Sequence, residues 1–221
     1  GRAATALVLA QEDRVALHPA TGLAWTHGAN IGREPRDAAE PGAPAALGTL
    51  PNAFGPEAAL HGLALLRACQ IAGALEAVLD MTVTYATTRK QFGRPIGGFQ
   101  AVQQLLARCA AEVAATGVAV AHACRAADRR GLGGAAFEIG CAKVVAGEAA
   151  GSAAAIAHQV HAAIGITDEH ALHLLTRRLW SWRDEGGAER FWAARIGAAA
   201  IARGGAALWP DLTAREEENP A

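Results

Sequence analysis

The chain has 221 residues and a formal net charge of −1 at pH 7, a length that suits one well-packed core, or one domain together with part of a second. The even mixture of acidic and basic side chains excludes a broad electrostatic attraction to nucleic acid or to an anionic membrane. No apolar run reaches the roughly 18 to 20 residues of a membrane span, and no charged-then-apolar leader opens the chain, so a soluble cytoplasmic protein is expected.

The first part of the chain predicts short strands over 6–10, 14–17 and 23–27, separated by polar or Gly/Pro turns. Three strands of this length are too few for a stable sheet on their own. From 30 to 55 the chain is rich in Pro, Gly and Ala without periodicity, which predicts a linker. We therefore expect residues 1–50 to be the remnant of a β domain with its linker.

Apolar residues at helical spacing predict five helices, over 56–89, 99–129, 135–162, 168–182 and 188–203. Long helices joined by short connections pack most simply as antiparallel neighbours. The fold class expected is mainly α, with a four-helix-bundle-like C-terminal domain over 51–204 and a short N-terminal β remnant. The tail, 205–221, is expected to be loosely ordered.

The cysteines of the chain are far apart and lie in apolar helical contexts, without the CxxC spacing of a metal or redox motif. Buried reduced thiols in a cytosolic protein are the interpretation that fits best. They are Cys69, Cys109, Cys124 and Cys141.

The segment that joins the first two long helices reads YATTRKQFGRPIGGFQ, residues 85–100, and carries Arg89, Lys90 and Arg94 in a Gly-rich bend. Such a cluster of cations can hold a phosphate. Cations also favour the C-terminal end of a helix without any ligand, and that end repels anions. On the residues alone, both interpretations stay open.

Two motifs nevertheless resemble one family. The string RKQFGRPIGGFQ is similar to the signature that joins the first two C-terminal helices of acyl-CoA dehydrogenases. The string AHQVHAAIGITDEHALH, residues 157–173, resembles that family's Gln-containing segment before its short fourth helix. This resemblance implies FAD-dependent α,β-dehydrogenation of an acyl-CoA thioester in a homo- or hetero-oligomer, expected to be a dimer of dimers, with a flavin-linked electron acceptor.

The resemblance also implies which residues touch the cofactor. Arg89, Phe92 and Gln159 would contact FAD bound mainly by the neighbouring subunit, and Gln91 stands where a hydroxyl or amide often assists. A guanidinium can bind a pyrophosphate bidentately, and an amide can both donate and accept hydrogen bonds. The family usually has two glycines after the Gln, whereas this chain has alanines, with Ala163 where a backbone amide would approach the nucleotide.

The reaction requires a carboxylate to remove the α-proton of the substrate. Some members of the family carry this carboxylate on the first long helix, and the resemblance puts Leu63 at that position. The next residue, Ala64, stands where the family has an arginine that contacts CoA. At the other place, an alignment without gaps puts Gly186 at the catalytic position, and a gap of one residue brings in Glu185. Glu185 is the candidate base, and its alternative role is an acidic residue before the next helix, which is favourable by itself.

Because it lacks both the base and the CoA-binding arginine, this chain resembles the non-catalytic partner subunit of heteromeric acyl-CoA dehydrogenases from bacterial steroid side-chain degradation. The stretch RRLWSWRDEGG, residues 177–187, also resembles that branch. Two functions are therefore weighed: a chain that itself takes part in acyl-CoA dehydrogenation, and a non-catalytic partner that completes the FAD site and stabilises a catalytic chain. A third is an inactive bundle that keeps only the packing of the family.

Two histidine pairs spaced i, i+3 could bind a metal ion from one helix face. Metal-carboxylate bundles usually draw their ligands from Glu-x-x-His on paired long helices, and that spacing is missing here. We therefore expect no metal. The pairs are His158 with His161 and His170 with His173.

Overall fold

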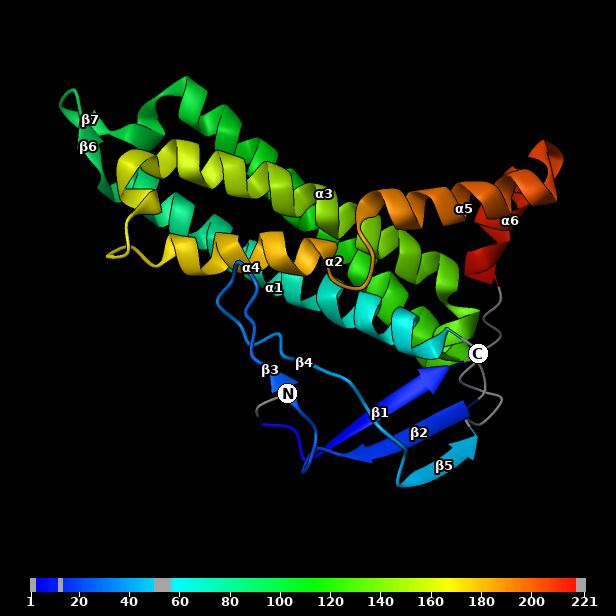
Figure 1. Cartoon of the computed structure of the whole chain (residues 1–221). Coiled ribbons are helices and arrows are strands. Elements are labelled where there is room, and N and C mark those ends of the chain that lie inside the picture. The colour runs from blue at the N-terminus through cyan, green and yellow to red at the C-terminus, as the bar shows by residue number, and fades with distance from the viewer. Residues whose placement is uncertain (1–2, 12–13, 50–56, 218–221) are drawn as a thin grey trace.

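The computed structural model describes residues 3–11, 14–49 and 57–217. The described chain is mainly helical with short strands near its N-terminus, which confirms the predicted fold class (Figure 1). Its α-helices are α1 Ala58–Thr88, α2 Gln100–Gly134, α3 Ala136–His161, α4 Leu172–Asp184, α5 Glu189–Arg203 and α6 Gly205–Glu217. Its strands are β1 Ala6–Gln11, β2 Arg14–Pro19, β3 Trp25–Thr26, β4 Ala38–Ala39, β5 Ala46–Thr49, β6 Lys90–Gln91 and β7 Arg94–Pro95, and 3-10 turns cover Ile96–Gly98 and Ala162–Ile166.

The core of the bundle lies between α1, α2 and α3, which pack against one another, while α4 and α5 cover α1 and α3 (Figure 1). Helix α3 contributes mainly alanines to this core, such as Ala146, Ala150 and Ala153. Their small side chains let the neighbouring helices approach closely. Larger side chains such as Ile71 and Leu75 on α1 are fully buried. Burying each of these contributes about 1.5–3 kcal/mol to folding.

The predicted turn between the second and third helices is present as a break at Gly131. This glycine has φ 71° and ψ 171°, a conformation that other residues rarely adopt, so helical geometry is interrupted there before α2 ends at Gly134. The predicted start of the first helix, Pro56, lies outside the described residues.

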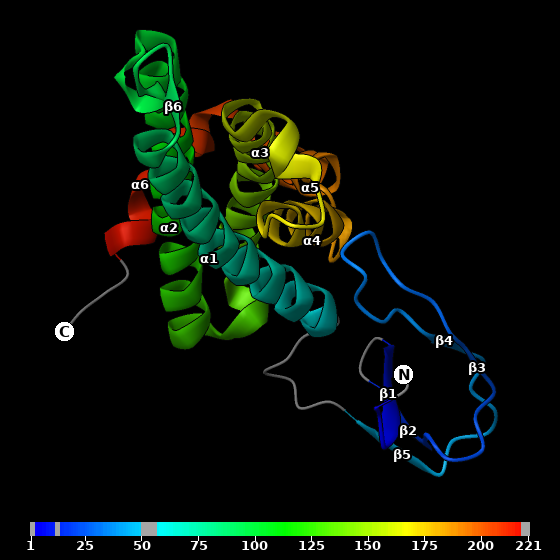
Figure 2. The same cartoon turned by 90° about the vertical axis from the view of Figure 1, so that its left-hand side faces the viewer.

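The N-terminal strands form a three-stranded antiparallel sheet in the order β1-β2-β5 and a two-stranded sheet of β3 with β4. Because β4 and β5 lie within 30–55, the prediction of a linker there is wrong for the described part of that range. Both strands are short and made of small residues, so they give no clear alternation of polar and apolar positions. Figure 2 shows this β region to one side of the helical bundle.

The prediction of a loosely ordered tail is also wrong for residues 205–217. Gly204, with φ 84°, ends α5, and a further helix α6 follows at once. Arg203 holds the two helices together, since its Nη2 donates a hydrogen bond of 2.6 Å to Oδ1 of Asp211. The sequence did not predict α6 because it contains Pro210, and proline normally disrupts the interior of a helix.

Helices α1, α2 and the stretch 136–166 are long and apolar enough to cross a membrane, judged by length and composition alone. This finding corrects the expectation that no run reaches that length. In the most apolar stretch of α3, 61% of the residues are buried inside the bundle, whereas in α2 the share is 17%. The packing therefore accounts for the apolar character of α3 and leaves much of α2 uncovered.

Candidate functional site

The two motifs that resemble the family lie at the same end of the bundle. Helix α1 ends just before the β6–β7 hairpin, and α3 ends at the 3-10 turn 162–166 (Figure 1). The rings of Tyr85 and His161 stack with their centroids 4.4 Å apart, and His170 packs edge-on against His161 at 4.8 Å. These aromatic contacts hold the last turns of α1 and α3 together, so residues separated by about seventy positions in the sequence become neighbours.

The side chains predicted to touch the cofactor point outward from this end. Arg89, Gln91, Gln159 and Ala163 are exposed, and the ring of Phe92 is 91% exposed. An aromatic ring left in water forgoes the free energy that its burial would supply. This arrangement fits a group that is presented from outside the chain, and the individual roles of the five residues stay predictions.

The backbone after Gln159 keeps a glycine-like shape although the glycines are absent. Ala162 has φ 55° and ψ −143°, a region that is costly for any residue with a Cβ, by about 1–3 kcal/mol. Gly165 lies so close to His161 that a Cβ on it would be 2.9 Å from the Cβ of that histidine. The strained residue is thus Ala162, which precedes the Ala163 singled out from the sequence.

The two positions that the resemblance assigns to the base lie side by side. A Cβ on Gly186 would be 3.0 Å from the backbone nitrogen of Ala64 and 3.2 Å from the carbonyl carbon of Leu63. Gly186 and Gly187 have φ values of 71° and 94°, so the turn after α4 depends on glycine to approach α1 this closely. Neither position carries a carboxylate, since one is a leucine and the other a glycine.

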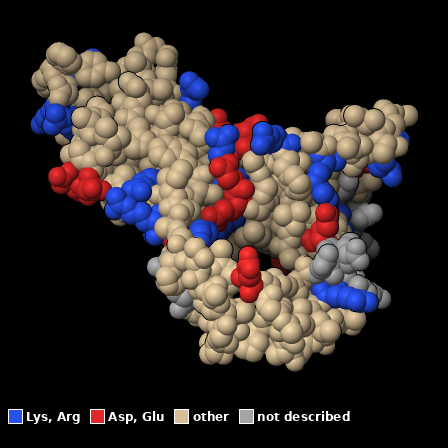
Figure 3. Space-filling view, in the orientation of Figure 1, with Lys and Arg blue, Asp and Glu red and all other residues tan. Residues whose placement is uncertain are grey.

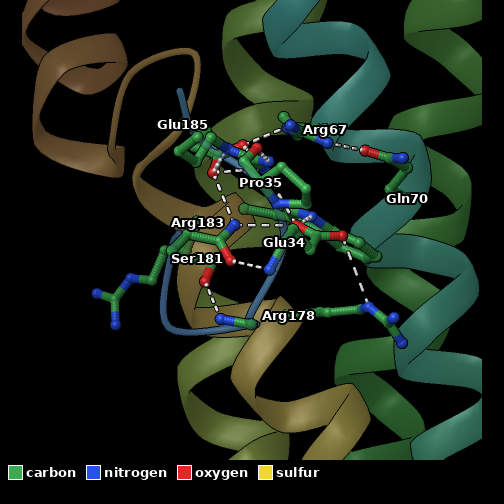
Figure 4. Close-up of polar contacts among 12 residues, drawn as sticks. Glu34, Pro35, Arg67, Gln70, Arg178, Ser181, Arg183 and Glu185 are labelled. Carbon is green, nitrogen blue, oxygen red and sulfur yellow. Dashed lines mark hydrogen bonds and ion pairs between the residues drawn. The ribbon is translucent and has the colours of Figure 1, made fainter. Parts of the chain in front are cut away.

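Glu185, the candidate base, is engaged in hydrogen bonds and ion pairs. Its Oε1 accepts hydrogen bonds from Nδ2 of Asn30 at 3.1 Å and from Nε of Arg36 at 2.8 Å. Its Oε2 accepts one from Nη2 of Arg36 at 2.8 Å and lies 2.5 Å from Nη2 of Arg67. Figure 4 shows Glu185 directed toward Arg67 on α1. Two guanidinium groups and an amide therefore use both carboxylate oxygens.

This environment sets the protonation of Glu185. Burial raises the pKa of its carboxyl, but the hydrogen bonds from Arg36 and Asn30 and the charge of Arg67 outweigh burial and hold the pKa below its ordinary value. A general base works best when its pKa lies near the working pH. The geometry therefore suits Glu185 as a permanently ionised structural group better than as a base.

A second carboxylate extends these contacts. Glu34 accepts hydrogen bonds from Nε1 of Trp182 at 2.9 Å and from Nδ2 of Asn30 at 2.9 Å. The backbone N–H of Gly32 donates to Oγ of Ser181 at 3.0 Å. We call Asn30, Glu34, Arg36, Arg67, Trp182 and Glu185 the carboxylate cluster, which joins the loop before β4 to α4 and α1.

Sequence reasoning missed this cluster because it interpreted the loop as a linker. The charged residues between 33 and 37 were its only signal, and their partners lie almost 150 residues away. Figure 3 shows acidic and basic side chains together in a band over the middle of the bundle, so the drawn face carries no large area of one charge.

A buried lysine supports the turn at Gly186. The side chain of Lys143 on α3 is fully buried, and its Nζ donates a hydrogen bond of 2.6 Å to the carbonyl oxygen of Arg183. Burial lowers the pKa of Lys143 to about 8, against the opposing effect of nearby acidic groups. From α5, Nε1 of Trp192 donates to the carbonyl oxygen of Gly186 at 2.9 Å. Two helices thus fix the turn between α4 and α5.

The histidine pairs make contacts within the bundle. Nε2 of His158 lies 2.9 Å from Oγ1 of Thr176, and Nδ1 of His161 lies 2.8 Å from the carbonyl oxygen of Ala157. Among the described residues, no group of three or more His, Cys, Asp or Glu side chains is arranged to hold a metal ion.

Comparison with known proteins agrees with this arrangement. The family model described as "Acyl-CoA dehydrogenase, C-terminal domain" matches residues 55–201. The chain is 41% identical over 115 residues to acyl-CoA dehydrogenase IpdE2 of Mycobacterium tuberculosis, covering 52% of this chain and 34% of that protein. It is 36% identical over 98 residues to glutaryl-CoA dehydrogenase of Desulfococcus multivorans, covering 44% and 25%.

Solved structures extend the likeness to the whole chain. The ChsE4-ChsE5 complex of Mycobacterium tuberculosis gives a TM-score of 0.79 at 26% identity, covering 100% of this chain and 58% of that one. A variant of the Tcur3481-Tcur3483 steroid ACAD gives 0.78 at 26%, covering 92% and 56%. The chain spans about a third of the length of IpdE2, the curated relative named above. Since the family model covers most of the chain, the chain belongs to the acyl-CoA dehydrogenase family, a family of oxidoreductases, and contains its C-terminal helical domain.

Proposed function

We infer that this chain acts within an oligomeric acyl-CoA dehydrogenase, where it completes the FAD site of a catalytic neighbour and does not supply the catalytic base. The overall reaction would be α,β-dehydrogenation of an acyl-CoA thioester. Acyl-CoA dehydrogenases depend on FAD, which accepts the hydride removed from the substrate. The proposed place of action is the cytoplasm, with a flavin-linked electron acceptor.

One observation carries this proposal. The two positions available for a base lie against each other at Leu63 and Gly186, and both lack a carboxylate. The adjacent Glu185 has both oxygens bound by Asn30, Arg36 and Arg67. To remove a proton, Glu185 would have to break several charge-assisted hydrogen bonds, which are among the stronger polar interactions in proteins.

The opposite end of α1 supports a cofactor role. Arg89 could bind phosphate oxygens through its guanidinium, Phe92 could cover an apolar ring, and Gln159 could exchange hydrogen bonds with polar edges of the nucleotide. All three are exposed, and the ring of Phe92 at the tip of the hairpin meets the ring of Phe99 edge-on but is otherwise open to solvent. These properties fit FAD held chiefly by another subunit.

The relatives also bear on the substrate class. Two similar structures, each at 26% identity, are the ChsE4-ChsE5 complex and a steroid ACAD composed of two named chains. They favour a bulky acyl-CoA substrate and a hetero-oligomer over a short-chain homo-oligomer.

The test is to replace Glu185 by Gln in the complex purified from the native cells together with its partner. We expect turnover per bound FAD to stay within about twofold, because the base comes from elsewhere. Unfolding free energy should fall by about 1–3 kcal/mol, since the partly buried Arg36 and Arg67 lose their counter-charge. Glu169→Gln, the same substitution at an exposed position, is the control and should change neither turnover nor stability.

A large loss of turnover in Glu185→Gln would contradict the proposal. Removing a general base typically slows a reaction by 10² to 10⁴-fold. If Glu185→Gln assembles, binds FAD and yet loses activity on that scale, Glu185 is the base and this chain is itself catalytic. If neither FAD nor a partner accompanies the native chain, the inactive-bundle alternative holds.

A further inference from the structure

Two cysteines face each other across the helical bundle. Cys69 on α1 and Cys124 on α2 have their Sγ atoms 3.6 Å apart, and both side chains are half-buried. A disulfide needs a sulfur separation of about 2.05 Å, so the atoms must approach by roughly a further 1.5 Å. The two sulfurs are therefore already in van der Waals contact, which is the starting arrangement that a disulfide between the two helices requires.

We propose that Cys69 and Cys124 form a reversible disulfide between α1 and α2 when the protein meets a hydroperoxide. The sequence alone predicted reduced thiols, because the two residues are far apart in the chain and lack redox spacing. The fold brings them into contact. This pairing does not depend on the function proposed above.

The chemistry takes place in two steps. One of the two sulfurs, as a thiolate, attacks one oxygen of hydrogen peroxide, and the O–O bond breaks to give a sulfenic acid and, after protonation, one water. The other sulfur then attacks the sulfenic sulfur, which releases a second water and forms the S–S bond. Two thiols and one peroxide thus give one disulfide and two waters, and the peroxide is the oxidant that is reduced.

The local environment limits how fast the pair reacts. Burial, together with the neighbouring Cys124, raises the pKa of Cys69 to about 11, so Cys69 is a thiol at neutral pH. Because only thiolates react, cross-linking should be slow near pH 7 and faster near pH 9.

The bond would also constrain the proposed cofactor end. The ring closed between residues 69 and 124 contains most of α1, the β6–β7 hairpin and most of α2. Arg89 and Phe92 lie within it. A cross-link over such a span lowers the entropy of the unfolded chain and so stabilises the folded one.

The experiment treats the purified, fully reduced chain with a few equivalents of hydrogen peroxide at pH 7 and at pH 9, followed by alkylation and intact-mass analysis. We expect a loss of 2 Da, a fall from four titratable thiols to two, and a map of unreduced peptides that joins residues 69 and 124. The melting temperature should rise by about 5 °C or more, and dithiothreitol should reverse the change.

Single substitutions separate this proposal from general oxidation. Cys69→Ser and Cys124→Ser should each abolish the 2 Da loss and the rise in melting temperature, while Cys141→Ser should retain both. Addition of oxygen to the thiols without a cross-link, a disulfide that maps to Cys109 or Cys141, or bonds formed only between chains would overturn it.

Discussion

Arg89 and Lys90 are neighbouring exposed cations after α1, and they allow a test at the scale of one residue. If Arg89 binds phosphate oxygens bidentately, Arg89→Ala should weaken FAD retention by the assembled complex about 10- to 100-fold, since such hydrogen bonds contribute about 1.5–3 kcal/mol. Lys90→Ala removes the same charge without the planar guanidinium and should have a much smaller effect. Flavin absorbance per complex after gel filtration measures both.

Two outcomes would contradict that role. Equal losses for Arg89→Ala and Lys90→Ala would show a general effect of charge at the end of α1. Unchanged FAD retention in Arg89→Ala would remove this residue from the cofactor site.

For single residues, the sequence predicted candidate site residues that lie within the two motifs. It missed contacts between residues that are far apart in the chain. The resemblance led to Arg89, Phe92 and Gln159, and these lie exposed at one end of the bundle. The hydrogen bonds of Glu185 with Arg36 join residues 149 positions apart, and no periodicity or spacing encodes such a pair. The positive φ of Ala162 was missed because alanine rarely adopts it.

Among the elements, helices with repeated apolar positions were predicted well. The predicted helix over 135–162 corresponds to α3, Ala136–His161, because its buried face repeats over seven turns. Strands β4 and β5 and helix α6 were missed, since pairing between short alanine-rich segments and a helix that contains Pro210 leave weak local signals. The domain boundaries at 50 and 204 stay predictions.

Lys143 allows a prediction about how α3 holds α4 and the turn that follows. Its pKa is about 8 in the folded chain, below its ordinary value of 10.5. Between these values the unfolded chain binds the proton that the folded chain has lost, so the contribution of Lys143 to the free energy of unfolding rises with pH. Below pH 8 both states are protonated, and the folded chain bears the full cost of the buried charge.

Urea unfolding of the wild type and of Lys143→Met from pH 7.5 to 9.5 measures this contribution. The difference between wild type and variant should rise by at most about 1.4 kcal/mol per pH unit above pH 8. The raised pKa of Cys69 acts in the opposite direction, with stability lost as pH rises from 9 toward 11, but it is common to both proteins and cancels. A difference that stays flat would show that Lys143 does not lose its proton in this range.

At the scale of the whole molecule, the described chain covers α2 less than it covers the other two long helices. In the most apolar stretch of α2 only 17% of the residues are buried. Exposed positions recur three or four residues apart along one side of the helix and are mostly small and apolar: Ala107, Ala111, Ala114, Val118 and Ala121. Small side chains let another helix approach closely, and a large uncovered apolar area favours association. We propose that another acyl-CoA dehydrogenase subunit covers this side of α2, within a dimer of dimers.

Val118→Arg tests this assembly. Val118 is 71% exposed, so arginine there should leave the melting temperature of the isolated chain nearly unchanged. In an assembled complex the same charge would lie in an apolar contact, where an unpaired charge is costly, so association should weaken at least tenfold by light scattering across a dilution series. Leu47→Arg, which replaces an aliphatic side chain 76% exposed on β5, is the matched control and should assemble normally. Normal assembly of Val118→Arg would mean that α2 faces solvent in the complex, and the partner would then have to bind another surface.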